Sequence, residues 1–393
     1  MRILLFTDAL PELARGGLDL HVQELATALA AEDLEVVTYT ARGQQSGHGG
    51  PAAQLARRLS QGSEDSTLGA FDAVLAEKQP DLVHIHSLQG LSHRLPERAV
   101  RFGIPVVWTL HDLYSICPRS HLHDGHGKPC SSPQLGAACG PCFGGLKGLL
   151  AAPVFGLRYA GYFGALHRCD RLIAPSQYIA DVLLGEGVNS ARIEVLPPGL
   201  PAPIRLAEPG GMDGACRFVF AGDLREAKGA DLAVAAVTSL QEPSIHLELH
   251  GGAPAPPAPR EVAYEDRLRQ AATGSSVNFH GRYEPEELLS ILDGAAALIV
   301  PSRVRESFGR TANLALQAGV PVIAANHGAL PEFIYEGVNG CLFEPGEVDS
   351  LADAMQRILE RGLELQAEIE SWPETPQLEH HTEALIQLYG ALI

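Results

Sequence analysis

Short apolar runs alternate with amphipathic segments along nearly the whole chain, and this alternation constrains the fold more than any other feature. Arg2–Thr7 is continuously apolar, which is typical of a strand covered on both faces in a parallel sheet. Asp19–Ala30 follows, with Leu20, Leu25 and Leu29 at helical spacing. The repeated order strand, helix, strand predicts right-handed βαβ units and therefore a doubly wound α/β sheet.

The same order continues in two series separated by a segment rich in Pro and Gly, Pro197–Gly214, which we interpret as a linker. Further strands are expected at Leu34–Tyr39, Leu82–His86, Pro105–Leu110, Arg171–Ala174 and Ile193–Leu196, and then at Arg217–Ala221, Ile245–Leu249, Val277–His280, Ala297–Val300 and Pro321–Ala324. At roughly 150 residues per domain, 393 residues fit two domains. We therefore predict two Rossmann-like domains, over residues 1–200 and 201–377.

The balance of charge and cysteine restricts the class of protein. With 29 basic and 47 acidic residues the net charge is −18, which is unsuited to a groove for nucleic acid. No run of 18 uncharged apolar residues appears, and Met1–Asp8 is too short for a secretory signal, so we expect a cytoplasmic protein. An odd number of cysteines, seven, favours reduced thiols over a disulfide scaffold.

Two of the loops that follow strand ends are suited to phosphate, because ligands of parallel sheets bind at the carboxyl ends of strands. The amides of Gly16 and Gly17 can approach a phosphate or sugar closely, although an ordinary turn explains the pair equally well. In the stretch from Gly222 to Gly229, Lys228 precedes a helix and can hold a diphosphate; the alternative is a surface lysine.

Two further loops carry an acid beside a helix start. In the stretch Pro301–Thr311, Glu306 can accept hydrogen bonds from sugar hydroxyls, while amides near Gly309–Thr311 can receive phosphate oxygens. The alternative is an acid that interacts only with the helix dipole. His327–Glu332 repeats the order strand, tight turn and acid.

Together these loops resemble the retaining glycosyltransferases of family 4, which have the GT-B fold. The resemblance covers nearly the whole chain and rests on order and spacing. Its motifs are Gly16-Gly17, Asp81-Leu-Val-His-Ile-His86, Thr109-Leu-His111-Asp112, Ala174-Pro-Ser176, Lys228-Gly229, Glu306-Ser-Phe-Gly309, Gly319-Val-Pro-Val-Ile323, Pro331-Glu332 and Gly337-Val-Asn-Gly340.

The resemblance implies two domains facing each other across a cleft and a role for each matching residue. It implies that His111 contacts the sugar beside the anomeric carbon, that Lys228 binds the diphosphate, and that Glu306 holds sugar hydroxyls. It also implies that a helix over 378–393 packs back on the first domain. We predict His111 and Glu306 as catalytic. The predicted donor-binding residues are Gly16, Gly17, Gly222, Arg225, Lys228, Arg282, Ser307, Phe308, Gly309, Arg310 and Thr311.

Two positions depart from the family pattern. Asp223 stands where the family usually has Arg, so Arg225 or Arg310 must compensate or Asp223 must point away from phosphate. Leu314 stands where a second Glu would bind ribose hydroxyls, and the adjacent Asn313 lies about 100° round a helix from it. These departures leave open how tightly the protein binds a nucleotide, or which nucleotide it binds.

A loop between His111 and Gly145 interrupts the strand–helix order. Cys117, Cys130, Cys139 and Cys142 have the spacing C-x12-C-x8-C-x2-C, which predicts either a structural zinc or free thiols. Cys169, Cys216 and Cys341 are expected to be small buried apolar residues. Of two histidines near one strand end, we expect His84 and His86 to point to opposite faces, with His84 packed.

The function that fits best is transfer of a sugar, with retention, from a UDP- or GDP-sugar to a hydroxyl acceptor in polysaccharide or glycoconjugate biosynthesis. Catalysis is expected to need no metal at the diphosphate and no other cofactor. Two alternatives stay open: a nucleotide-sugar epimerase on the same architecture, and a catalytically degenerate sugar-binding paralogue. Two interpretations of Gly144–Arg168 stay open. The segment is a helix of the domain core, or it contacts the inner face of the membrane peripherally, near an acceptor that is linked to a lipid or a glycan.

Overall fold

The chain forms two compact units, and in the sequence the residues of the second lie between the two segments that form the first. Unit 1 comprises Met1–Pro201 and Pro376–Ile393, and unit 2 comprises Ala202–Thr375. The computed structural model describes residues 1–7, 16–40, 64–124, 129–130, 136, 138–143, 152–202, 216–253, 259–367 and 372–393. Most of the predicted linker, residues 203–215, therefore lies outside the described residues.

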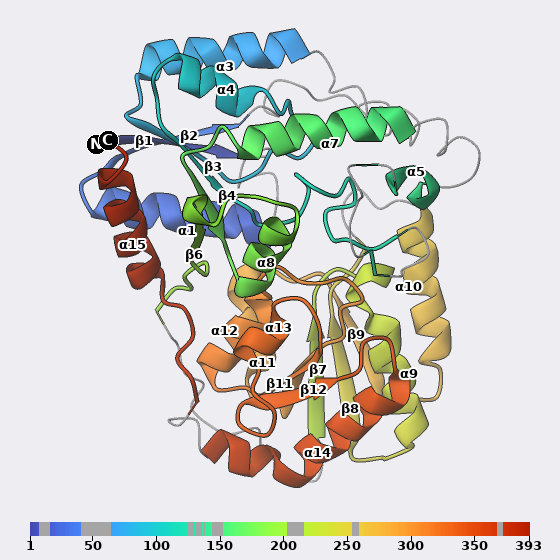
Figure 1. Cartoon of the computed structure of the whole chain (residues 1–393). Coiled ribbons are helices and arrows are strands. Elements are labelled where there is room, and N and C mark those ends of the chain that lie inside the picture. The colour runs from blue at the N-terminus through green and yellow to red at the C-terminus, as the bar shows by residue number, and fades with distance from the viewer. Residues whose placement is uncertain are drawn as a thin grey trace. The chain divides into compact units, whose positions relative to one another are not determined.

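Unit 1 is built on a parallel sheet of six strands in the order β2-β1-β3-β4-β5-β6 (Figure 1). The strands are β1 (Arg2–Thr7), β2 (Glu35–Thr40), β3 (Leu82–Ile85), β4 (Val106–Thr109), β5 (Arg171–Ala174) and β6 (Ile193–Val195). Ile3 of β1 pairs with Val36 of β2 and with Leu82 of β3. The central position of β1 explains its continuous apolar run, because both of its faces are covered.

Alternate side chains of β1 enter two different cores. Ile3 and Leu5 pack with α1 (Gly17–Ala31) and α15 (Leu378–Gly390) on one face of the sheet. Leu4 and Phe6 pack on the other face, with α3 (Glu64–Lys78), α7 (Ala152–Leu166) and α8 (Gln177–Gly185). The remaining helical elements of unit 1 are α4 (Leu95–Arg101), α5 (Cys139–Cys142) and η3 (Ser190–Arg192).

The carboxyl-terminal helix α15 lies beside α1, although the two are far apart in sequence (Figure 1). Leu385 and Tyr389 are fully buried there, while Leu388 and Leu392 pack at the edge of the same core. The amphipathic leucines of this helix thus have their apolar partner surface in unit 1.

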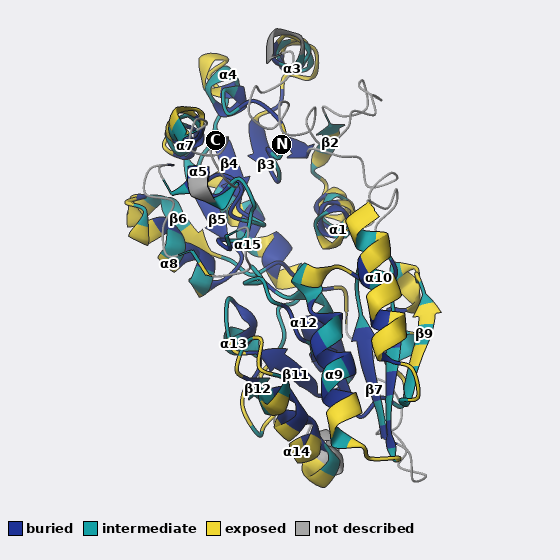
Figure 2. Ribbon diagram, turned by 90° about the vertical axis from the view of Figure 1, so that its right-hand side faces the viewer, coloured by how far each residue is buried: buried dark blue, intermediate teal, exposed yellow. Residues whose placement is uncertain are grey.

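Unit 2 contains a second six-stranded parallel sheet, in the order β12-β11-β10-β7-β8-β9. Its strands are β7 (Cys216–Ala221), β8 (Ile245–His250), β9 (Val277–Gly281), β10 (Ala297–Val300), β11 (Val322–Ala325) and β12 (Gly340–Phe343). Its helical elements are η4 (Glu226–Lys228), α9 (Ala230–Leu240), α10 (Pro259–Ala271), η5 (Pro285–Glu287), α11 (Leu288–Leu292), α12 (Arg310–Ala318), α13 (Leu330–Phe333) and α14 (Val348–Ala367). The central β7 is largely buried, whereas the edge strand β9 is largely exposed (Figure 2).

The α/β class and the two doubly wound parallel sheets are confirmed. Most expected strands appear within one or two residues of their predicted ends, but α3, α10, α14 and β12 had not been predicted. In the segment Gly144–Arg168, α7 begins at Ala152, residues 144–151 lie outside the described part, and Phe155 and Tyr162 are buried in the core. Among the described helices, none has the length and apolar character needed to cross a membrane.

Candidate functional site

An ion pair joins two loops of unit 2 at the carboxyl ends of its strands. Lys228 follows β7 and Glu306 follows β10, and these strands are neighbours in the sheet. Lys228 Nζ lies 2.7 Å from Glu306 Oε1. The Ser302 hydroxyl donates a second hydrogen bond of 2.7 Å to the same oxygen. A cation and an acceptor thus lie together where parallel sheets bind ligands.

Glu306 is held in its ionised form. Burial alone would raise its pKa, but the charge of Lys228 and the hydrogen bonds from Lys228 and Ser302 outweigh it, so the pKa lies below the usual value. The lysine side chain is 39% exposed and the glutamate 18% exposed, so a ligand can reach the cation first. His327 Nε2 hydrogen-bonds the Ser302 carbonyl at 2.8 Å and supports the loop from behind.

Gly229 is required where the chain turns from η4 into α9. Its φ is +72°, and a Cβ there would lie 2.0 Å from the carbonyl oxygen of Pro301. Only glycine allows both the left-handed conformation and this close approach. The contact brings the Lys228 loop against the Glu306 loop, and it explains why Lys228-Gly229 occur together.

The other predicted donor-binding residues of unit 2 belong to the same group of loops. Gly309 has φ +75° and caps the start of α12, whose first residues are Arg310 and Thr311. Phe308 is buried and packs edge-to-face on Phe333. Gly222 follows the last residue of β7, and Ser307 lies between Glu306 and Phe308. The guanidinium of Arg282 donates a 2.9 Å hydrogen bond to the carbonyl of Ala253.

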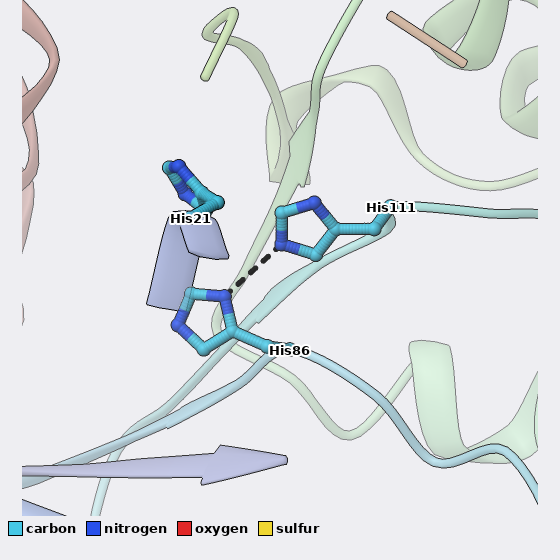
Figure 3. Close-up of side chains that lie close together, drawn as sticks. All are labelled: His21, His86 and His111. Carbon is cyan, nitrogen blue, oxygen red and sulfur yellow. Dashed lines mark hydrogen bonds between the residues drawn. The ribbon is translucent and has the colours of Figure 1, made fainter. Parts of the chain in front are cut away.

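A cluster of histidines lies in unit 1 at the carboxyl ends of β3 and β4. His86 follows β3, His111 follows β4, and His21 projects from α1 (Figure 3). His86 Nδ1 and His111 Nε2 are 3.1 Å apart, joined by the hydrogen bond drawn in Figure 3. The ring of His381 from α15 packs edge-to-face on that of His21, with centroids 5.2 Å apart. Tertiary structure therefore adds three histidines to the predicted His111.

Three of these histidines, His86, His111 and His381, are neutral. Burial, with a smaller contribution from His381, lowers the pKa of His111 to about 3. Burial likewise lowers the pKa of His381 to about 4 and holds that of His86 well below its ordinary value. At neutral pH the rings can therefore donate and accept hydrogen bonds without carrying charge.

The expectation for His84 and His86 was wrong in one respect. Their ring centroids are only 4.1 Å apart, so both side chains lie on the same face of the sheet. Residues two apart in a strand share a face, and only adjacent residues alternate. His84 is packed as expected: its ring nitrogens hydrogen-bond the hydroxyls of Tyr389 at 2.6 Å and Thr109 at 2.7 Å.

Gly16 and Gly17 begin α1. The amide of Gly16 donates to the Asp19 carboxylate at 3.1 Å, and the Gly16 carbonyl accepts from Leu20. The acid at this helix start occupies one amide that could otherwise bind an anion.

None of the seven cysteines, all of which lie among the described residues, forms a disulfide. Cys169, Cys216 and Cys341 are buried, as predicted. Cys117 and Cys139 are buried and Cys130 and Cys142 half-buried. Burial and the other three thiols raise the pKa of Cys139 to about 12. Among the described residues, two sets place three potential metal-ligand atoms within 4.8 Å of one another: His21 with His86 and His111, and Glu248 with His250 and His280. Neither set includes a cysteine.

Two family models together match most of the chain. The model "Glycosyltransferase Family 4" matches residues 15–202, and "Glycosyl transferases group 1" matches residues 215–361. The chain belongs to glycosyltransferase family 4.

Relatives and solved structures agree with this membership. The chain is 27% identical to a D-inositol 3-phosphate glycosyltransferase of Acidothermus cellulolyticus, over 88% of this chain and 79% of the relative. It is 26% identical to a glycogen synthase of Mycobacterium tuberculosis, over 92% and 86%. The fold matches sucrose-phosphate synthase of Thermosynechococcus elongatus with TM-score 0.72 and 20% identity, covering 100% and 98%. Anabaena HepE, solved with UDP, gives TM-score 0.69 and 17% identity over all of both chains. The protein is a glycosyltransferase with the GT-B fold.

The two departures from the family pattern have structural explanations. Asp223 forms an ion pair with Arg225, whose Nε also lies 3.1 Å from the carboxylate, so acid and base neutralise each other. Leu314 packs half-buried against the core of unit 2. The adjacent Asn313 is fully buried and donates 3.1 Å to the carbonyl of Phe308, so it holds the loop from within.

Sequence reasoning missed the supporting roles of Ser302, His327 and Asn313 in this glycosyltransferase. Ser302 was visible as the second residue after a strand end, within the loop that carries Glu306. No local pattern predicted the role of Asn313, because its hydrogen bond to the Phe308 carbonyl forms only when α12 and the preceding loop fold together.

Proposed function

We propose that this glycosyltransferase moves a sugar from a nucleoside-diphosphate sugar, UDP- or GDP-linked, to a hydroxyl acceptor with retention of configuration. The observation that carries the proposal is the Lys228–Glu306 pair at the carboxyl ends of β7 and β10. The related fold of Anabaena HepE, solved with UDP-glucose, supports this class of donor. The relatives' names, glycogen synthase among them, support glycan or glycoconjugate acceptors.

In the proposed reaction the bond between the anomeric carbon and the diphosphate oxygen breaks, and a bond to the acceptor oxygen forms. Negative charge grows on the leaving diphosphate, where Lys228 stabilises it together with the amides at the start of α12. Glu306, kept ionised, accepts hydrogen bonds from sugar hydroxyls. The departing phosphate takes the acceptor's proton. Because Lys228 supplies the positive charge at the diphosphate, we propose that the step uses no metal there and no cofactor.

His111 is proposed to contact the sugar beside the reacting carbon. Its ring is neutral, and its Nε2 hydrogen-bonds His86. The bond fixes the orientation of the ring. Gly16 and Gly17, at the start of α1, are proposed to lie near the transferred sugar and the diphosphate.

A thermal-shift screen of the purified protein against UDP, GDP, ADP and their sugars tests donor binding, because a ligand bound only to the native state raises Tm. Release of nucleoside diphosphate from the stabilising donor then tests catalysis. Binding with slow release of nucleotide and free sugar supports the transferase. Interconversion of the donor's sugar would indicate an epimerase. Binding without any turnover would indicate the degenerate paralogue suggested by Asp223 and Leu314.

A lipid-linked acceptor at the inner membrane face is part of the proposal. α7 exposes Leu157 (75%) and Val154 (38%) while its other side is in the core, and Arg168 follows its last turn. An apolar strip with a nearby cation suits a peripheral membrane surface. Flotation with anionic liposomes at low salt tests it. Protein that stays wholly in the dense fraction, with and without donor, leaves α7 as a core helix only.

A further inference from the structure

Three side chains with metal-binding atoms converge at one corner of the sheet of unit 2. Glu248 and His250 lie two residues apart in β8, and His280 lies in the neighbouring strand β9. One ligand atom from each lies within 4.8 Å of the other two. The carboxylate of Glu248 directly contacts His280 Nε2. None of the three belongs to the ion pair or the histidine cluster of the proposed transferase site.

The fold aims these side chains at one face of the sheet, where Glu248 and His250 are half-buried and His280 is exposed. Leu247 and Leu249 of β8 point into the core with no exposed surface, so Glu248 and His250 point the opposite way. The strand register shifts between Leu249 and His250, which brings His250 beside the last residues of β9. β9 is the edge strand and carries exposed residues (Figure 2). The His280 side chain is 45% exposed.

The three groups are also braced before any ligand arrives. Asn278 Nδ2 donates a 3.0 Å hydrogen bond to Glu248 Oε1, which orients the carboxylate toward β9. The rings of His250 and His280 are stacked, 4.3 Å apart and only 5° from parallel.

We propose that Glu248, His250 and His280 form a binding site for a divalent transition-metal ion, for which zinc is the best match. Two imidazole nitrogens and one carboxylate oxygen are the donor set that zinc accepts in sites with an open fourth position. Ligands about 2.0–2.2 Å from zinc are about 3.3 Å from one another in a tetrahedron. Side chains already within 4.8 Å of one another reach this geometry by small rotations at the open edge.

The ion links the carboxyl ends of β8 and β9. Gly251 and Arg282 come directly after these ends, and the amide of Gly251 already donates to the carbonyl of Gly281 at 2.6 Å. A metal across the two strands therefore fastens the base of two loops, including the one that carries Arg282. The consequence is metal-dependent stability of unit 2, which can be measured without any sugar transfer.

Isothermal titration of the full chain with Zn²⁺ at pH 7.5, compared with Ca²⁺, tests the proposal. His280→Ala and His250→Ala should each weaken zinc binding at this site at least tenfold. Glu248→Gln should weaken it as much, because it removes the negative charge of the carboxylate ligand. His246→Ala is the matched control, because His246 lies on the same strand outside the set, and it should bind zinc like the parent. Metal should raise Tm in the parent and the control only.

Zinc at the cysteine segment or at the histidines of unit 1 must be distinguished from this site. The titrations are therefore repeated in the Cys139→Ser/Cys142→Ser background, and anomalous diffraction from zinc-soaked crystals locates the ion. Density between Glu248, His250 and His280, lost in His280→Ala, supports the site. Unchanged zinc affinity in all three variants, or density only at other donors, would overturn it and leave Glu248 and His280 as an ordinary surface ion pair.

Discussion

The Lys228 ammonium pairs with Glu306, a residue 78 positions away in the sequence. The ammonium neutralises Glu306 in the free protein and becomes the cation for a diphosphate when donor binds. Lys228→Ala should weaken binding of the donor nucleotide sugar by about 1.5–3 kcal/mol, the range for a hydrogen bond to a charged group. Titration calorimetry measures the change.

Arg225→Ala is the matched control for Lys228→Ala. Arg225 follows the same strand, but its charge is balanced by Asp223, so its removal should change donor affinity much less. Equal losses in the two variants would show that the diphosphate is held by the whole loop and not principally by Lys228.

His111 should affect the reaction more than binding. Since its proposed contact is beside the reacting carbon, His111→Ala should lower kcat and kcat/KM together by about tenfold or more, with little change in donor Kd. Steady-state kinetics and calorimetry on the same preparation separate the two effects. A raised Kd with unchanged kcat would assign His111 to ground-state binding only.

At the scale of single elements, the turn from η4 into α9 depends on the close approach between Gly229 and Pro301. Gly229→Ala should destabilise the protein by about 2 kcal/mol or more, because a left-handed alanine alone costs roughly 1–2 kcal/mol and the Cβ would also meet a carbonyl oxygen. It should also weaken donor binding by displacing Lys228.

Gly274→Ala is the control for Gly229→Ala. Gly274 has φ +80° with open space around its Cβ position, so alanine there carries the conformational cost alone. Chemical denaturation of both variants should rank Gly229→Ala as clearly the more damaging. Similar losses would show that the Pro301 contact relaxes easily.

The cysteine segment makes a second prediction for an element. Arg119 Nε lies 3.2 Å from Cys142 Sγ and its guanidinium also donates to the Cys142 carbonyl, so the turn after Cys117 is tied to α5. We propose that Cys117, Cys130, Cys139 and Cys142 hold one structural zinc. Metal analysis of protein purified without chelator should find zinc that Cys139→Ser/Cys142→Ser removes. Protein that contains no zinc at these thiols would leave them as reduced cysteines.

At the scale of the whole molecule, the buried neutral histidines link stability to pH. The unfolded chain binds protons near pH 6.5, whereas His381 in the folded protein does so only near 4. The free energy of unfolding therefore falls as pH drops from about 6.5 to 4. For His381 the difference of about 2.5 pKa units corresponds to about 3 kcal/mol.

His381→Gln should flatten this acid dependence, while His380→Gln, at the exposed neighbouring position, should leave it unchanged. Urea denaturation at pH 7.5, 6 and 5 measures the slope. The comparison concerns slopes, so it remains informative even when His381→Gln lowers stability at every pH. Parallel slopes in all three proteins would mean that His381 titrates normally.

Much of the fold could be read from local patterns. β1, β5 and β10 appear at their predicted bounds, because continuous apolar runs are properties of a few adjacent residues. α14 and α10 were not recognised. α10 contains many charged residues and buries only Tyr264 and Leu268, so its pattern resembles an exposed loop.

Local patterns are enough to predict the class of fold, the two sheets, and the loops that carry Lys228, Glu306 and His111, because strand ends and glycines mark them within a few adjacent residues. Which side chains meet depends on how the chain folds. His84 bonds Tyr389 across 305 positions, and Glu248, His250 and His280 converge through the pairing of two strands. Periodicity specifies the face on which a residue lies, whereas its contacts depend on register and on which element packs against that face.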